Sequence, residues 1–88
     1  MNPDAVPKIR TGVRTSYDQT RESHVVLFPE GVLVLNETAA AVVDLCDGRT
    51  SVGDIARKLA DDFDGVEPRD VAELVARLVA RRVVDLDG

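Results

Sequence analysis

Short apolar runs separated by a turn mark the extended part of the chain. HVVLF at 24–28 and VLVL at 32–35 are rich in β-branched residues, which is typical of strands. The intervening PEG favours a tight turn, because Pro29 presets φ at the second position of a type I turn and Gly31 tolerates a positive φ. We therefore predict a β-hairpin over 24–35, closed by a three-residue loop with a bulge.

Helical periodicity begins directly after this hairpin. Asn36 fits the N-cap of a first helix, Ser51 that of a second, and Pro68 the first turn of a third. Gly48 is expected to close the first helix in the left-handed conformation. The spacing of apolar residues then predicts helices over 37–47, 52–63 and 69–82.

The order of these elements indicates the fold class. A strand is predicted over 13–18, ahead of the hairpin, and VVDLDG at the end of the chain reads as a short extended tail. Residues 1–8 contain two prolines and few apolar side chains, so we expect a flexible or loosely docked tail followed by one domain over 9–88. Strands followed by three short helices predict an α+β, winged-helix-like domain.

The hairpin and the third helix carry more apolar surface than one small core needs. Both hairpin strands are apolar on both faces. On a helical wheel the third helix has one stripe of Val71, Leu74, Val75 and Leu78 and a second of Ala72, Ala76 and Val79, together spanning roughly 200°. Either this helix touches two elements of its own domain, or one stripe receives a partner. The pattern alone leaves both interpretations open.

Composition narrows the classes of partner. The chain has 88 residues, a formal net charge of −5, 44% hydrophobic residues and a single cysteine. An acidic domain is poorly suited to phosphate neutralisation, and one cysteine excludes an intramolecular disulfide and a C-x-x-C metal site. The N-terminus has no apolar signal region, and no apolar run approaches the about 18 residues that span a membrane, so we expect a cytoplasmic protein.

Catalytic constellations are missing from the sequence. His24 is the one histidine and has no second ligand at metal-binding spacing. No nucleophile elbow or phosphate-binding glycine loop is present. The carboxylates at 61, 62 and 64 read as a solvated helix end, and Cys46 as a buried, inert thiol. We therefore predict a binding module without a cofactor rather than an enzyme.

One long segment is similar to a known family. LFPEGVLVLNETAAAVVDLCDGRTSVGDIARKL resembles PqqD, the small accessory protein of pyrroloquinoline quinone biosynthesis. The resemblance depends on PEG, LNETAA and LCDG at these spacings and on the helix opened by RTSVGDI. Arg14 and Tyr17-Asp18 fit the family's first strand. The resemblance runs from about residue 9 to residue 86.

The resemblance implies a fold, a function and a site. PqqD-like proteins are peptide chaperones of the RiPP recognition element class, with a three-stranded antiparallel sheet followed by three helices. They bind the ribosomal precursor peptide (PqqA) and associate with the radical S-adenosylmethionine enzyme (PqqE) that crosslinks its Glu and Tyr side chains. The leader lies as an added strand on the third strand, against the third helix. Carried over here, the third strand is Val32, Leu33, Val34 and Leu35, and the groove wall is Ala72, Val75, Ala76 and Val79. The helical wheel adds Arg69 and Arg82 at the rim, where they could meet acidic residues of the peptide.

Several alternatives to this function stay open. The chain could serve as the recognition element of another RiPP pathway. A winged-helix DNA-binding protein would share the fold, but its basic residues Arg57 and Lys58 are offset by neighbouring aspartates. The third class is a purely structural dimerisation module. The exposed hairpin edge also predicts a homodimer or strand-swapped dimer at high concentration.

Overall fold

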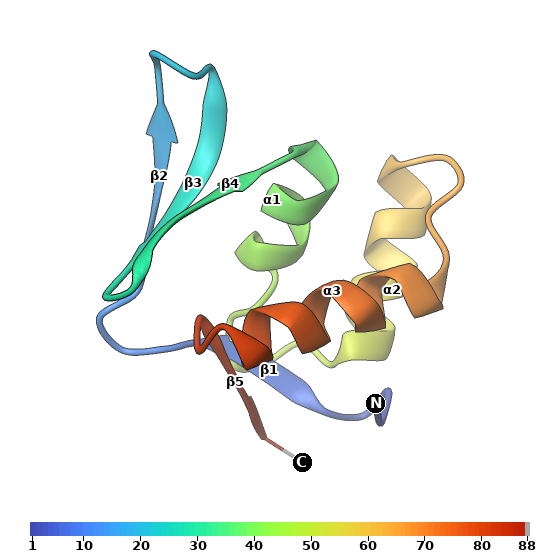
Figure 1. The fold of residues 1–88 in the computed structure, drawn as a ribbon. Coiled ribbons are helices and arrows are strands. Elements are labelled where there is room, and N and C mark those ends of the chain that lie inside the picture. Colours follow the sequence, from blue (N-terminus) through green and yellow to red (C-terminus); the bar gives the residue numbers. More distant parts are fainter. Residues whose placement is uncertain (88) are drawn as a thin grey trace.

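A computed structural model describes residues 1–87 and has the expected α+β architecture (Figure 1). A three-stranded antiparallel sheet in the order β2-β3-β4 is followed by three helices, as predicted. A second, two-stranded sheet pairs β1 with β5 and was not predicted. In chain order the elements are β1 (Val6–Ile9), β2 (Arg14–Asp18), β3 (Ser23–Phe28), β4 (Gly31–Leu35), α1 (Glu37–Asp44), α2 (Val52–Asp62), α3 (Pro68–Ala80) and β5 (Val84–Asp87).

The predicted hairpin is present, with a shorter loop than expected. Phe28 pairs with Gly31, so Pro29 and Glu30 alone form the loop. The expected loop of three residues with a bulge is therefore wrong. Gly31 adopts a φ of +152° while still taking part in the strand ladder. A positive φ at this position is what glycine permits, and here it serves the last paired residue rather than a bulge.

The two faces of the hairpin differ in how far their side chains are buried. Leu33 and Leu35 lie on the face that meets the helices, and Leu35 is buried. Leu27, Val32 and Val34 lie on the opposite face and remain 39%, 53% and 48% exposed. Val25, opposite Val34 on the same face, is buried, so the surplus of apolar positions corresponds to a sheet face that the described part of the chain covers only in part.

Side chains cap the helices where the sequence indicates. The Oδ1 atom of Asn36 accepts a hydrogen bond of 2.8 Å from the Ala39 N–H at the start of α1. The hydroxyl of Ser51 accepts one of 3.1 Å from the Asp54 N–H at the start of α2. Pro68 is the first residue of α3, where its missing N–H costs nothing. Each cap satisfies a backbone donor that the helix itself leaves unpaired.

The connection between α1 and α2 differs from the prediction. Helix α1 ends at Asp44, three residues earlier than expected. The Asp47 carboxylate accepts hydrogen bonds from the backbone N–H groups of Arg49 (2.8 Å) and Thr50 (2.9 Å), which builds a turn of its own. These bonds hold the pKa of Asp47 below its ordinary value. Gly48, at φ +77°, belongs to this turn and does not close the helix.

The single cysteine is a buried thiol, as predicted. Cys46 is 3% exposed, and its Sγ donates to the Val42 carbonyl oxygen at 3.2 Å. Burial, with a smaller contribution from the Asp47 charge, raises its pKa to about 12. A thiol in this state is a poor nucleophile, so it has a packing role.

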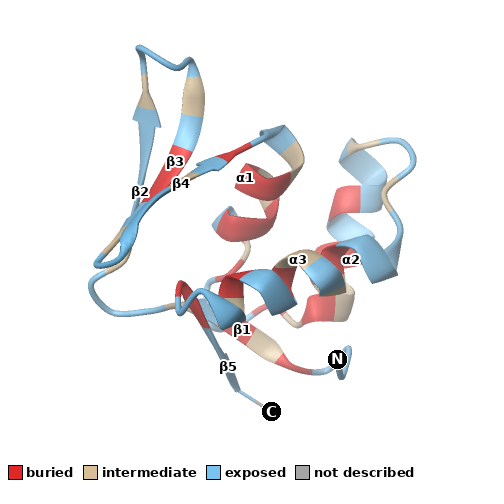
Figure 2. Ribbon diagram, viewed as in Figure 1, coloured by how far each residue is buried: buried red, intermediate tan, exposed pale blue. Residues whose placement is uncertain are grey.

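Helix α1 lies at the centre of the core. It packs on β3 and β4 on one side and on α2 and α3 on the other, and the buried positions of the helices face one another (Figure 2). The inward face of α3 consists of Val71, Val75 and Leu78, at helical spacing. The core is aliphatic, as the shortage of aromatic residues requires. Its largest fully buried side chains include Ile55, Leu59, Leu78, Val26, Val42, Val71, Val75, Val83 and Val84.

The first residues of the chain are docked, in contrast to the loose tail expected over 1–8. Ala5 and Pro7 are buried. The Ala5 and Pro3 carbonyl oxygens accept hydrogen bonds of 2.9 Å from the N–H groups of Val52 and Gly53, the first two residues of α2. Residues in β1 pair with β5, so the extended tail expected at the C-terminus is also a paired strand. Main-chain pairing, which requires few apolar side chains, explains why the composition gave no sign of this.

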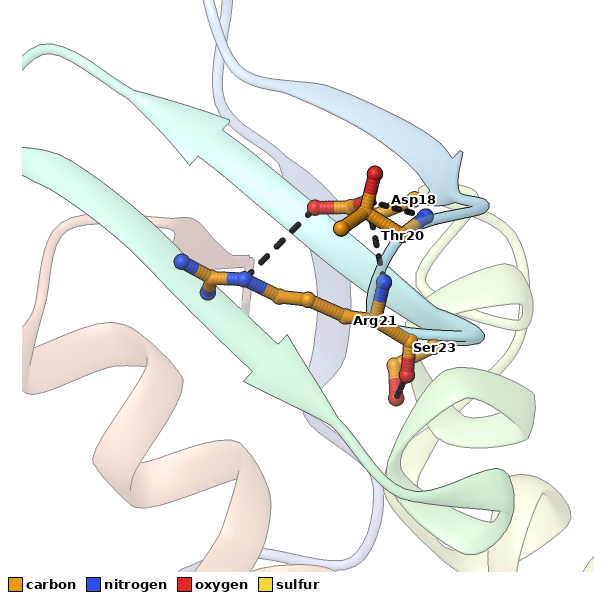
Figure 3. Close-up of polar contacts among 4 residues, drawn as sticks. All are labelled: Asp18, Thr20, Arg21 and Ser23. Carbon is orange, nitrogen blue, oxygen red and sulfur yellow. Dashed lines mark hydrogen bonds and ion pairs between the residues drawn. The ribbon is translucent and has the colours of Figure 1, made fainter.

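The loop between β2 and β3 is held by its own side chains (Figure 3). Asp18 Oδ1 accepts from the N–H groups of Thr20 and Arg21 at 2.9 and 3.2 Å, and its Oδ2 lies 3.6 Å from the Arg21 Nε. The Ser23 hydroxyl donates to the Arg21 carbonyl oxygen. Glu22 takes a φ of +52°. The polar QTRES segment thus forms a specific turn, which these contacts stabilise.

Candidate functional site

A hollow of about 240 Å³ lies between β4 and α3. Its sides come from segments far apart in the sequence, which α1 brings together by packing on both of them. In Figure 1 β4 lies at the left and α3 crosses the lower middle, with α1 above α3 and to the right of β4. The lining residues are Leu33, Val34, Leu35, Asn36, Ala39, Leu74, Arg77, Leu78 and Arg81.

The edge of the sheet beside this hollow has main-chain groups without partners in the structure. Within residues 1–87, β4 pairs with β3 on one side and with no strand on the other. In a hairpin with a two-residue loop the flanking pair, here Phe28 and Gly31, is hydrogen-bonded, and such pairs alternate with non-hydrogen-bonded ones. Val32 and Val34 therefore direct their N–H and C=O groups to the free edge. The edge can accept another strand.

The hollow combines an apolar floor with a basic rim. Leu33 and Leu74 are half-buried, and Leu78 is buried. Arg77 and Arg81 are exposed at its edge. In the described part of the chain neither guanidinium forms an ion pair, whereas Arg69 lies 3.3 Å from a Glu67 oxygen. The arrangement suits an extended peptide with apolar and acidic side chains.

The β4 residues expected in the site lie at the hollow, with one exception. Leu33, Val34 and Leu35 line it. Val32 is not among the lining residues, and its side chain is on the opposite face of the sheet. Its main chain nevertheless belongs to the free edge, so it can still contribute through hydrogen bonds.

The α3 residues expected in the groove wall lie elsewhere on the helix and do not line the hollow next to β4. Val75 is completely buried in the core, and Val79 is half-buried against it. Arg69 and Ala72 line a different hollow, formed with the N-terminal segment and α2. Ala76 is exposed and lines none of the hollows described here. The wall next to β4 is the neighbouring face of the helix.

The residues that the sequence analysis missed are Leu74, Arg77, Leu78 and Arg81. Leu74 and Leu78 belong to the stripe of Val71, Leu74, Val75 and Leu78, and apolar content alone does not distinguish a groove from a core. A signal was nevertheless present. Arg77 and Arg81 follow the two leucines at spacing i+3, which places the cations on the same flank of the helix. Leu74, half-buried next to an arginine, thus belongs to a mixed surface, whereas Leu78 is both a core residue and part of the floor of the hollow.

Among residues 1–87, no group of three or more His, Cys, Asp and Glu side chains is placed to hold a metal ion. His24 instead packs edge-on against Tyr17, with ring centroids 5.1 Å apart. No helix in the same span has the length and apolar character needed to cross a membrane.

Curated proteins similar to this chain have a shared description. A protein of Xanthomonas oryzae pv. oryzae named "PqqA binding protein" is 41% identical over 87 residues, covering 94% of each chain. A protein of the same name from Methylococcus capsulatus is 38% identical, covering 85% of this chain and 82% of the relative. A "Bifunctional coenzyme PQQ synthesis protein C/D" from Methylorubrum extorquens is 36% identical over 91% of this chain, which corresponds to 22% of that longer protein.

A solved structure extends the similarity to the fold. The solution NMR structure of the PqqD truncation of Methylobacterium extorquens PqqCD, described as a functional and stand-alone RiPP recognition element, superposes with a TM-score of 0.71. It is 37% identical, and the match covers 91% of this chain and 88% of that one. The family model for coenzyme PQQ synthesis protein D matches residues 23–84, from the start of β3 to the start of β5. This span contains both walls of the hollow, and the chain belongs to the PqqD family.

Proposed function

We propose that this chain is a peptide chaperone of pyrroloquinoline quinone biosynthesis, which binds the leader of a PqqA-like precursor peptide. The names of its relatives support the choice of peptide. The observation that carries the proposal is the free edge of β4 beside a hollow with an apolar floor. An edge of this kind offers sequence-tolerant main-chain pairing, and the hollow offers selectivity.

The peptide pairs with the main chain of Val32–Leu35 and extends the sheet by one strand. Each such hydrogen bond contributes only roughly 1 kcal/mol after exchange with water, so side chains must supply most of the selectivity. We place these contacts on Leu33, Leu74 and Leu78 rather than on the wall expected from the sequence. The hollow of Arg69 and Ala72 opens beside the N-terminal segment, and no β4 residue lines it.

Two substitutions at one position test strand addition. Val34→Pro removes an N–H group that faces the free edge and leaves the β3 ladder intact. Val34→Thr keeps the N–H with a side chain of similar size, and is the matched control. In calorimetric titration with a synthetic Methylococcus capsulatus PqqA peptide, we expect Val34→Pro to lose at least tenfold in affinity and Val34→Thr to stay within about twofold.

Circular dichroism verifies that both variants stay folded. Tight binding by folded Val34→Pro would exclude strand addition on β4. Failure of the unmodified chain to bind this peptide would leave recognition of another RiPP precursor as the remaining peptide-binding candidate.

A radical S-adenosylmethionine enzyme of the PqqE type is the second partner we propose, in a ternary complex that presents the peptide to it. The family resemblance supports this partnership. Adding the enzyme to the same assay provides the readout, because crosslinking of the peptide should require this chain and weaken with Val34→Pro. Equal crosslinking rates with and without the chain would exclude the role.

We expect no catalytic turnover of the peptide by the isolated chain, and we propose that the protein acts in the cytoplasm.

The free β4 edge also supports a homodimer, or a strand-swapped dimer, at high concentration. Peptide bound at that edge would then shift the dimer toward monomer. DNA binding is disfavoured, since Arg57 on α2 is paired with Asp54 and the chain is acidic.

A further inference from the structure

The cations beside the groove are spaced along one line of α3. Arg77 and Arg81 are four residues apart on the helix, which separates their Cα atoms by about 6 Å along the axis. Both line the hollow next to β4. Neither is neutralised by a carboxylate in the described part of the chain. Two guanidinium groups without an ion-pair partner among the described residues therefore lie beside the position of an added strand.

An extended peptide on β4 has a matching repeat. Its side chains alternate between faces, and residues i and i+2 on one face are about 6.8 Å apart. One of its two faces points toward α3, on the same side as Leu33 and Leu35. The spacing of the two arginines thus agrees, to within about 1 Å, with the spacing of alternate peptide residues.

We infer that the precursor peptide is selected through two acidic side chains separated by one residue, which pair with Arg77 and Arg81. This inference rests on the proposed function and specifies its ligand. Guanidinium–carboxylate pairs are the strong, geometrically selective contacts that a largely apolar hollow otherwise lacks. The residue between the two acids points away from the helix and is free to vary.

The distribution of charged and apolar residues along the groove also indicates at which end of β4 the acidic pair binds. Arg81 lines a second hollow with Phe28, Glu30, Ala80 and Arg82, next to the hairpin loop. Leu74, one turn before Leu78 on α3, and Asn36, directly after the end of β4, line the first hollow but not the second. The acidic residues consequently pair near the loop end of β4, and apolar peptide residues contact the end near α1. Glu30 is the carboxylate on the same rim, and it disfavours a third acidic residue beyond the loop.

Neutral substitutions separate these two cations from the rest of α3. Arg77→Gln and Arg81→Gln should each weaken binding of the Methylococcus capsulatus PqqA peptide by about five- to tenfold at low salt, and the double variant more. Arg69→Gln, on the same helix but away from this hollow, is the matched control and should leave affinity unchanged. Salt should reduce affinity more steeply for the wild type than for the double variant.

The peptide side of the contact is tested by replacing each acidic residue of the same peptide with its amide. Two positions separated by one residue should reproduce the loss seen with the arginine variants, and lysine at these positions should restore binding to Arg77→Glu/Arg81→Glu. Unchanged affinity in the arginine variants, or carboxylates at other spacings, would overturn the acidic pair while strand addition stood. Absence of any binding by the wild type would instead count against the proposed function.

Discussion

Asp47 fixes the connection between α1 and α2 with a single carboxylate. Besides the two backbone contacts, its Oδ2 lies 3.2 Å from the hydroxyl of Thr50, which donates to it. These donors favour the charged form and lower the pKa of Asp47 from 3.8. A carboxylate whose pKa is lower in the folded state stabilises the fold above its unfolded pKa, and this contribution is lost as pH falls through the folded value.

Asp47→Asn should therefore lower the melting temperature at pH 7, and the gap to wild type should narrow steadily as pH falls below about 4. Thermal unfolding followed by circular dichroism from pH 7 to pH 2.5 measures the gap. Asp64→Asn, at an exposed aspartate in the loop after α2, controls for the general loss of a negative charge. A gap that stayed constant down to pH 2.5 would show that the charge on Asp47 does not support the turn.

The same turn marks a limit of sequence reasoning about single residues. A positive φ at Gly48 was foreseeable, and Gly48 does adopt one. Two structures use such a glycine, a helix C-cap and a turn closed by a preceding aspartate. The choice between them depends on contacts distant in sequence, since the residues after α1 pair with β1: the Ile9 N–H donates to the Cys46 carbonyl oxygen and the Gly48 N–H to the Pro7 carbonyl oxygen.

At the scale of elements, the helix caps and the hairpin were predictable because their signals are local. Asn36 and Ser51 act within three residues of their partners. The face of α3 that meets β4 was not predictable, because apolar residues occupy roughly 200° of the wheel and a core-facing stripe needs only about half of that arc. The structure selects Val71, Val75 and Leu78 for the core and leaves Leu74 at the groove.

A matched pair of substitutions tests this orientation of α3. Val75→Asp buries a charge at a position with 0% exposure, which should cost roughly 4 kcal/mol or more and remove most of the net stability of a small domain. Leu74→Asp, one residue earlier and half-buried, should cost about 1–2 kcal/mol and leave the chain folded but defective in peptide binding. Urea unfolding and calorimetric titration measure the two effects. A folded Val75→Asp together with an unfolded Leu74→Asp would mean that the helix is rotated from its position here.

At the scale of the whole molecule, the two ends of the chain meet. Val6 pairs with Asp87 and Ile9 with Val84, closing a sheet between segments at opposite ends of the sequence. No local sequence pattern indicates a pairing between strands so far apart in the chain. The pairing depends on the helices, which bring the two ends together. The two elements that border the hollow were easier to anticipate, since the hairpin has its own turn signal and α3 has a visible apolar excess.

Removal of residues 1–9 should expose how far this closure stabilises the molecule. The deletion leaves β5 without its partner and removes the carbonyl groups that accept from Val52 and Gly53 at the start of α2. We expect a loss of roughly 2–4 kcal/mol, or about 10–25 °C in melting temperature, for a domain of this size. Peptide binding should persist below the lowered transition, because β4, α1 and α3 are retained.

A point substitution distinguishes specific docking from the mere length of the chain. Ala5 is 2% exposed, so Ala5→Asp should undock the segment and reproduce part of the loss, while Asp4→Ala, at its exposed neighbour, should change little. Differential scanning calorimetry compares the melting temperatures of the deletion and of the two variants. If Ala5→Asp melts with the wild type, the segment 1–8 is a loose tail after all, and α2 is held by its own Ser51 cap and by packing on α3.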